Sequence, residues 1–383
     1  FLSSLLFPMG IAAENDGVAT LPVKANGKSV LDRRFPYVKM KREDVSGAGQ
    51  AIMWTAHPAG RKDGSDPMKI VAGVDIGGTK CAVLVGRENN GTLEILEKER
   101  FATGLQMPPD EVMGKVTAIL DRYAGYHPEG IGISCGGPLD SRAGTVECPP
   151  NLPLWDHVPV CDMLASRYHI PAKLQNDANA CALAEWKFGA GQGAENVIFL
   201  TFGTGLGAGL ILNGRLYAGS SDMAGECGHM RLCEYGPTGY GKEGSFEGFC
   251  SGSGIAQLGY TLGLAAFQRG ERPAYFDPAN PRDVTAKSVA DAADQGDETA
   301  IQVYALCGEY LGRGLSVLID ILNPDKIILG SIFARSRELL WPSAEKVIEK
   351  ETLLLSRRCC QVVPALLGEK LGDFAALSVA LYA

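Results

Sequence analysis

The sequence has little positive charge and no run of apolar residues long enough to span a bilayer. Its 383 residues carry 36 Lys and Arg against 44 Asp and Glu, which gives a formal net charge of −8. An acidic surface does not attract nucleic acid or anionic lipid, so the composition argues against both as partners. Residues 1–7 also lack the basic region of a secretion signal, with a remnant of a processed leader as the alternative.

A paired cysteine framework is missing as well. The eleven cysteines are an odd number and are scattered from Cys81 to Cys360. This pattern predicts reduced thiols in a reducing compartment, which favours a cytoplasmic protein. We therefore expect a small-molecule ligand, with neither nucleic acid nor a membrane as a partner.

Residues 1–67 show neither a sustained helical period nor a strand period, and turn-forming residues are scattered through them. They predict a poorly structured N-terminal extension. No pair of amphipathic helices with a short intervening turn can be laid over them, so a helix-turn-helix DNA-binding domain is not expected there.

From residue 69 onward, strand and helix patterns alternate, and the hydrophobic content of 46% is enough for a large core. Strands are predicted at 70–74 and 81–85, joined by a hairpin, and a second copy of this pattern at 197–201 and 208–212. A helix is expected over 110–123, ended by Gly125, and a strand over 130–134. Two lobes of an α/β fold follow, with ligands at the loops beyond the strand ends.

A long helix is predicted downstream, with Asp297 as its N-cap and Asn323-Pro324 as its end. Its expected apolar face consists of Ile301, Tyr304, Leu311, Leu315, Leu318 and Leu322. A strand over 326–329 then ends at Gly330.

Two glycine turns join the paired strands. The first contains Gly77, Gly78 and Thr79 after the strand-end Asp75, and the second contains Gly203, Thr204 and Gly205. Glycine lets a phosphate oxygen approach the backbone N–H groups, and a carboxylate such as Asp75 suits Mg²⁺, directly or through water. Either turn alone fits an ordinary hairpin, whereas two matched copies favour a grip on a triphosphate.

The segment 176–180 (NDANA) follows an apolar stretch and precedes a helical pattern, which places Asp177 near a helix N-terminus. Helix capping is one interpretation, because Asp and Asn are favoured there. The other is a general base that accepts a hydroxyl proton during phosphoryl transfer.

Glu226, His229 and Glu247 form a third candidate group. Two carboxylates and an imidazole can hold neighbouring hydroxyls of a polyol by hydrogen bonds. A buried, satisfied histidine is the alternative for His229.

An ordered series of motifs from about residue 68 to the C-terminus resembles the repressor, ORF, kinase (ROK) family of bacterial sugar kinases and sugar-responsive regulators. The motifs are DIGGTK (75–80), GGPLD (136–140), PNLPLW (150–155), NDANA (176–180), GTGLG (203–207), ECGH (226–229) and GSG (252–254). The resemblance implies a two-lobed actin/hexokinase-like (ribonuclease H-like) ATPase fold with a cleft between its lobes. It also implies ATP and Mg²⁺ as cofactors and a homodimer.

The resemblance assigns roles to matched positions. Asp177 matches the catalytic base of the family. The positions that match sugar contacts are Asn151, Asn176, Glu226, His229 and Glu247, while Gly330 and Ser331 lie where the family approaches adenosine. The implied reaction transfers the γ-phosphate of ATP to a hydroxyl of a hexose such as glucose, fructose, mannose or an N-acetylated hexosamine.

One segment departs from the family pattern. The family typically follows its histidine with C-x-C-G-x-x-G-C-x-E, whose cysteines bind zinc together with that histidine. The matching positions here are Thr238, Tyr240 and Ser245. His229 alone cannot complete a tetrahedral site, so we expect no structural zinc, and other groups, such as the chain from 232 to 240, must orient His229.

We expect a small lobe at 68–188, a large lobe at 189–366, and a C-terminal helix at 367–383 that returns to the small lobe, as the resemblance implies. Two alternatives to a kinase stay open. One is a sugar-responsive regulator of the same family, and the other is a sugar-binding protein that has lost turnover.

Overall fold

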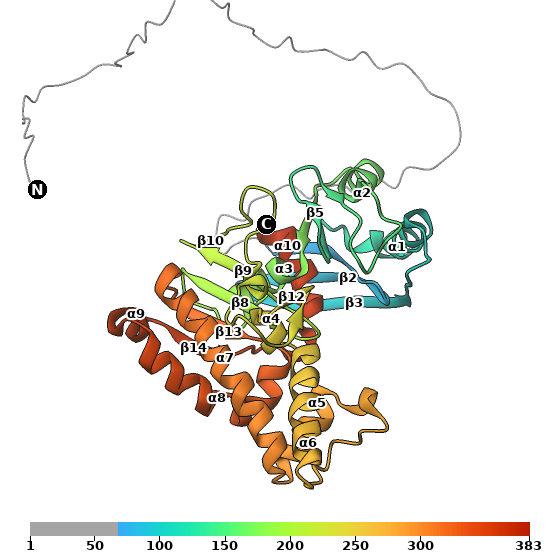
Figure 1. Ribbon diagram of the computed structural model, residues 1–383. Coiled ribbons are helices and arrows are strands. Elements are labelled where there is room, and N and C mark those ends of the chain that lie inside the picture. Colours follow the sequence, from blue (N-terminus) through green and yellow to red (C-terminus); the bar gives the residue numbers. More distant parts are fainter. Residues whose placement is uncertain (1–67) are drawn as a thin grey trace, which may run out of the picture. The chain divides into compact units, whose positions relative to one another are not determined.

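Two five-stranded sheets with the same pairing pattern organise residues 68–383, the part of the chain that this computed structural model describes (Figure 1). The first sheet has the order β3 (Thr92–Ala102), β2 (Lys80–Asn89), β1 (Lys69–Ile76), β4 (Ile131–Cys135) and β7 (Ala172–Asn176). The second has the order β10 (Arg215–Leu216), β9 (Leu206–Leu212), β8 (Val197–Phe202), β13 (Lys326–Leu329) and β14 (Gln361–Pro364).

In each sheet the first three strands pair antiparallel and the last three pair parallel. Both predicted hairpins are therefore confirmed as the β1–β2 and β8–β9 pairs. The duplication extends beyond the hairpins to whole sheets. The predicted extension, residues 1–67, lies outside the described residues.

Ten α-helices, four 3₁₀ turns and two short ribbons complete the described part of the chain. The helices are α1 (Pro109–Tyr123), α2 (Val160–Tyr168), α3 (Asp177–Phe188), α4 (Phe246–Phe249), α5 (Gly252–Gln268), α6 (Ala286–Asp294), α7 (Glu298–Leu322), α8 (Ile332–Glu351), α9 (Leu354–Cys359) and α10 (Leu371–Tyr382). The ribbons pair β5 (Leu139–Asp140) with β6 (Thr145–Val146), and β11 (Thr238–Gly239) with β12 (Lys242–Glu243).

The predicted ends of α7 are confirmed. The Asp297 carboxylate accepts a hydrogen bond from the Ala300 N–H (2.9 Å), and Asn323 ends the helix with a φ of 44°. Most of its predicted apolar face is buried, but Ile301 was wrongly assigned and is 42% exposed. The buried stripe at the start of α7 is formed by Ala300, Val303 and Tyr304, which are at most 1% exposed, and Ile301 lies beside this stripe.

The bounds of two predicted elements of the small lobe differ slightly from the prediction. Helix α1 begins at Pro109, and β4 runs over 131–135 instead of 130–134. Gly125 does not end the helical path, because a 3₁₀ turn (Ala124–Tyr126) continues it to His127, which has a φ of 53°.

Helices α3 and α10 lie between the two sheets (Figure 1). Leu183 of α3 packs in one cluster with Phe199 of the second sheet and with Val379 of α10. The opposite side of α10 packs on the first sheet, where Leu377 joins a cluster with Leu84. The body of α3 thus rests on the second sheet, and α10 ties it to the first.

The predicted lobe boundaries at 188/189 and 366/367 stay a prediction, although the last helix does pack on the first sheet. All eleven cysteines fall within residues 68–383 and are free thiols. Over the same residues, the longest apolar helices fall short of what a bilayer crossing requires.

Candidate active site

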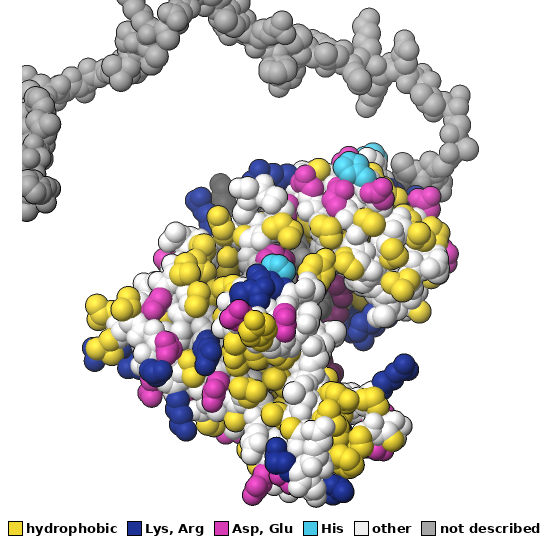
Figure 2. Space-filling view, viewed as in Figure 1, with side chains coloured by type: hydrophobic (Ala, Val, Ile, Leu, Met, Phe, Trp, Pro, Cys, Tyr) yellow, Lys and Arg dark blue, Asp and Glu magenta, His cyan; other side chains and the backbone are white. Residues whose placement is uncertain are grey.

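Three cavities share walls, and the surface of the molecule is indented between β3 and α5 (Figure 2). One is lined by residues from both halves of the chain, and another only by residues 203–336. Their volumes are about 440, 380 and 730 Å³, and we call them the first, second and third cavity. The first and second share Asn176, Leu206, Glu226 and Glu247. The second and third share Gly203 and Thr204. A ligand at one end therefore has a continuous path to a ligand at the other.

Asp177 lines the second cavity, opposite the second glycine turn. It is the first residue of α3, directly after β7, and the helix cap is the preceding residue. Asn176 Oδ1 accepts a hydrogen bond from the Ala178 N–H (2.9 Å), and Asp177 Oδ1 accepts from the same N–H (2.8 Å). Since Asn176 performs the capping, the second oxygen of Asp177 is left for another partner in the cavity.

The surroundings of Asp177 favour its protonated form. Desolvation raises the pKa of its carboxyl, and the backbone N–H groups of Ala178 and of Asp177 itself oppose this. A carboxylate with a raised pKa accepts a proton more readily than one in water.

Asp75 stands at the end of β1, beside Ser134 of β4 in the register of the sheet. Burial raises the pKa of Asp75 to about 6, with further contributions from the Asp177 and Asp373 carboxylates and with Lys80 and Ser134 opposing. Asp75 and Asp177 therefore lie close enough to repel each other. A divalent cation would relieve this uncompensated negative charge.

The residues present fit Mg²⁺. This ion is usually held by one or two carboxylates together with substrate phosphates and water. Asp75 supplies such a carboxylate, whereas no cluster of three or more His, Cys, Asp or Glu side chains suited to a metal occurs among residues 68–383. Any Mg²⁺ here would depend on phosphate ligands as well.

The first glycine turn is braced by the chain that leaves β3. The Gly77 N–H donates to the Lys80 carbonyl oxygen (3.0 Å), and Thr103 Oγ1 donates to the Gly77 carbonyl oxygen (2.6 Å). A Cβ atom on Gly78 would lie only 2.6 Å from the Asn151 carbonyl oxygen. This turn, including Thr79, lines none of the three cavities.

The second glycine turn is braced by α5 and lies beside Glu247, which also lines the first cavity. The Gly252 N–H donates to the Gly203 carbonyl oxygen (2.8 Å), and Ser253 Oγ donates to the Thr204 carbonyl oxygen (3.1 Å). A Cβ atom on Gly205 would lie 2.8 Å from Glu247 Oε2. Gly203 and Thr204 line both the second and the third cavity, and Gly205 lines the second.

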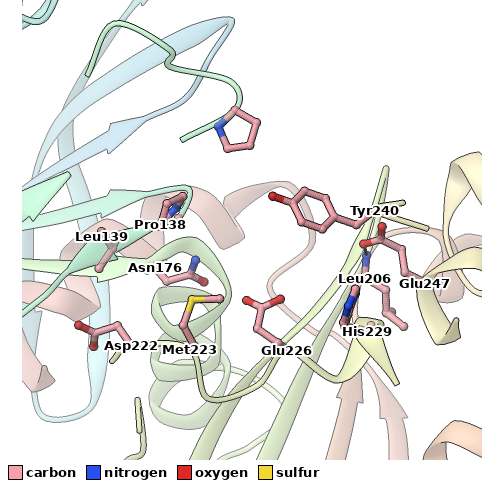
Figure 3. A pocket seen from close by; sticks show the side chains of 13 residues that line it. Pro138, Leu139, Asn176, Leu206, Asp222, Met223, Glu226, His229, Tyr240 and Glu247 are labelled. Atoms are coloured by element: carbon pink, nitrogen blue, oxygen red, sulfur yellow. Dashed lines mark hydrogen bonds between the residues drawn. The ribbon is translucent and has the colours of Figure 1, made fainter. Parts of the chain in front are cut away.

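Glu226, His229 and Glu247 meet in the first cavity together with Asn176 (Figure 3). Glu247 Oε2 accepts a hydrogen bond from the Leu206 N–H (2.9 Å), which fixes it beside the second turn. Desolvation raises the pKa of Glu226, with the Asp177 and Glu247 carboxylates adding to the effect and His229 opposing it. The His229 side chain is exposed to the cavity, so the alternative of a buried histidine is wrong.

The structure does not bring every predicted residue to a cavity. Asn151 packs against Gly78 and Gly136, and its neighbour Pro150 lines the first cavity instead. Ser331 lines the third cavity at the start of α8, with a φ of 52°, whereas Gly330 does not line it.

Sequence reasoning missed several residues of the first cavity, namely Pro138, Leu139, Leu206, Asp222, Met223 and Tyr240. Asp222 accepts two hydrogen bonds from Ser141, from its N–H (2.8 Å) and from its Oγ (2.7 Å). This contact joins the segment after β5 to the loop before Glu226. No local signal marks Asp222 or Met223, because their role depends on a contact between distant segments.

Hydrogen bonds order the segment in which the family cysteines are replaced. Lys242 Nζ donates to the His229 carbonyl oxygen (2.6 Å), and Ser245 Oγ accepts from the Gly248 N–H (3.0 Å) at the start of α4. Lys242 lies just beyond the predicted orienting stretch 232–240. The absence of zinc stays a prediction.

The duplicated sheets place this chain in the two-lobed actin/hexokinase-like (ribonuclease H-like) class of α/β proteins, and the predicted fold class is confirmed. Residues 71–382 match the ROK family. The chain belongs to this family, so the resemblance drawn from its motifs is confirmed as well.

Relatives of both kinds, enzymes and regulators, are similar to this chain. The glucokinase of Thermotoga maritima is 32% identical over 74% of this chain and 88% of the relative. The DNA-binding transcriptional dual regulator NagC of Escherichia coli is 27% identical over 70% of this chain and 66% of the relative.

A solved structure matches the two lobes closely. The ROK glucokinase of Streptomyces griseus, in complex with glucose and AMPPNP, has a TM-score of 0.64 and 30% identity. The match covers 82% of this chain and 99% of that one.

Proposed function

We propose that this chain is an ATP-dependent sugar kinase that transfers the γ-phosphate of ATP to a hexose hydroxyl. The observation that carries the proposal is the shared wall of the cavities. Asp177 stands in the second cavity, between a first cavity lined by hydrogen-bonding side chains and a third cavity reached past a glycine turn. Glucokinase relatives at about the same level of identity, one of them solved with glucose and AMPPNP, support it.

In this proposal the first cavity holds the sugar. Glu226, His229 and Glu247 accept or donate hydrogen bonds to neighbouring hydroxyls and so orient one of them toward Asp177. Asp177 accepts the proton of that hydroxyl on its free carboxylate oxygen as the hydroxyl oxygen attacks the γ-phosphorus. ADP leaves with the bond between the γ-phosphorus and the bridging oxygen broken.

The second and third cavities hold ATP, with its phosphates at residues 203–205 and its adenosine near Ser331. The Gly203 N–H already donates to the Gly205 carbonyl oxygen (3.1 Å), so the N–H groups of Thr204 and Gly205 are the donors for phosphate oxygens. Asp75 would hold Mg²⁺, which when bound neutralises phosphate charge. The remaining expectations belong to the same proposal: a homodimer in the cytoplasm, with no nucleic-acid or membrane partner.

A coupled ADP-release assay with Mg²⁺-ATP and a panel of hexoses tests the proposal. We expect turnover with at least one sugar, and a loss of about 10²- to 10⁴-fold in kcat for Asp177→Ala. Asp177→Asn is the matched control, because it keeps the shape and the hydrogen bond but cannot take the proton. Full activity in either variant would show that Asp177 is not the base.

The regulator alternative makes a different prediction when calorimetry is added to the ADP-release assay. A regulator or an inactive sugar-binding protein would bind a sugar in calorimetry but release no ADP with any member of the panel. Retention of Asp177 in the second cavity, which shares walls with both the first and the third, favours the enzyme.

A further inference from the structure

Tyr240 is an unassigned aromatic residue in the first cavity. It lies at the tip of the ribbon formed by β11 and β12 (residues 238–243, here called the hairpin arm). Figure 3 shows its ring extending over the cavity above Glu226, with the hydroxyl pointing toward the side of Pro138. The side chain is 78% exposed, so packing within the described residues does not explain its position.

The backbone at Tyr240 is unusual for such a residue. Tyr240 and Gly241 are the two turn residues between the paired Gly239 and Lys242, and their φ values are 44° and 73°. Two-residue turns with positive φ at both positions favour Asn, Asp or Gly, and a bulky residue there is an outlier. A strained residue whose side chain reaches over a ligand cavity points to a role in binding.

The base of the hairpin arm is fixed to the acceptor side of the site. Gln257 of α5 holds Thr238 twice, accepting from its N–H and donating to its carbonyl oxygen (both 2.9 Å). Lys242 holds the carbonyl oxygen of His229. The arm therefore positions Tyr240 relative to the same residues that face the sugar.

The wall across the cavity from Tyr240 is apolar. Pro138 and Leu139 come from the first lobe and Met223 from the loop before Glu226. Glu226, His229, Glu247 and Asn176 provide the polar part (Figure 3). A hexose ring has this same division, with hydroxyls around its edge and C–H groups on its faces.

We propose that Tyr240 is an aromatic platform that packs on a C–H face of the hexose ring and selects sugars by that face. The inference rests on the proposed function for the identity of the acceptor. Hexoses whose hydroxyls are equatorial present C–H groups on both faces, whereas an axial hydroxyl on the face that Tyr240 covers places a polar group against its ring. The hairpin arm thereby contributes to choice of substrate as well as to affinity.

Steady-state kinetics and calorimetry on the full chain test this. We expect Tyr240→Ala to raise KM and Kd for the best hexose of the panel about 3- to 10-fold, with KM for ATP unchanged. The preference for that hexose over the epimers with an axial hydroxyl on the covered face falls in the same variant. Tyr240→Phe keeps both constants within about twofold, since the ring and not the hydroxyl makes the contact.

Two further variants separate binding from a structural role. Tyr240→Asn suits the turn and should raise the melting temperature while losing sugar affinity like Tyr240→Ala. Tyr235→Ala removes another exposed tyrosine (70%, against 78% for Tyr240) that lines a different groove, and should leave all constants unchanged. Wild-type sugar constants in both Tyr240→Ala and Tyr240→Asn would overturn the inference.

Failure of the proposed function gives a different pattern. If wild type binds a hexose in calorimetry without turning it over, the kinase proposal fails, and the loss of affinity in Tyr240→Ala still supports the platform. If wild type binds no hexose, both proposals fail.

Discussion

The two glycine turns occupy equivalent places in two sheets of the same topology, yet the residues that precede them differ. Two residues before Gly77 stands Asp75, and two residues before Gly203 stands Thr201. Thr201 Oγ1 accepts from the Gly207 N–H (2.9 Å) and closes its own hairpin. Asp75 keeps a carboxylate whose pKa is raised to about 6. The first turn therefore follows a charged carboxylate, whereas the second follows a neutral threonine and lines two cavities.

The largest expected effect comes from removing that charge. Asp75→Asn should lower kcat/KM by about 10²-fold or more, because the cation ligand of the site is lost. Thr201→Ser keeps the hydroxyl at the equivalent position of the second turn and should stay near wild-type activity. Equal losses of kcat/KM in the two variants would contradict the idea that only the first turn supplies a cation ligand.

The same variant has an opposite effect on stability. Burial raises the pKa of Asp75 above its unfolded value, so its ionised form destabilises the fold above about pH 6. Asp75→Asn should then stabilise the free protein by about 1–2 kcal/mol at pH 8, with the gain vanishing below about pH 4, where the carboxyl is protonated in both states. Urea unfolding at the two pH values measures this, and an equal gain at both would contradict it.

The next largest effects come from adding a methyl group to each turn, because the two turns have different neighbours. In Gly205→Ala the new methyl group meets the carboxylate end of Glu247, which can move, so sugar KM should rise about 3- to 10-fold with a small change in melting temperature. In Gly78→Ala it meets the backbone of Asn151, and about 1–3 kcal/mol of stability should be lost. Steady-state kinetics and thermal unfolding on both variants measure this difference. An equal loss of stability in Gly205→Ala and Gly78→Ala would contradict it.

The smallest expected effect concerns the contact between Ser141 and Asp222. Removing the hydroxyl in Ser141→Ala leaves the N–H bond and should raise sugar KM about two- to threefold, since one hydrogen bond contributes about 0.5–1.5 kcal/mol. A double-mutant cycle with Asp222→Ala should show coupling between the two sites. Additive effects would indicate that the contact does not act on the cavity.

Local patterns predicted the turns and Asp177 because the information is local. Glycine at a strand end, and Asn-Asp before a helical period, define a backbone shape within a few residues. Tyr240, Met223 and Asp222 were missed because they line the cavity only together with segments that are distant in the sequence, such as Pro138 and Leu139. Ile301 was misassigned because its spacing of three from Tyr304 fits a helical period, although the buried stripe there is formed by Ala300, Val303 and Tyr304.

The residues alone suggested Glu226, His229 and Glu247 as a polyol-binding group, and the family resemblance added Asn151 and Asn176 to the sugar contacts. Glu226, His229 and Glu247 are twenty-one positions apart at most, and their meeting depends on how α4 packs beside the 3₁₀ turn (Cys227–His229) that contains His229. Asn151 was assigned by its motif alone. Its contacts with Gly78 and Gly136 indicate that it supports the first turn in this conformation.

Helix α10 has a consequence for the order of events during folding. One face of the first sheet packs on α1 and α2, so this cluster forms from residues that are close in sequence. The other face packs on residues 371–382, which lie about 300 positions after β1, so this contact closes a loop that contains the whole second sheet. Helix α3, which begins with Asp177, packs against the same helix. The region around Asp177 should therefore become ordered late in folding.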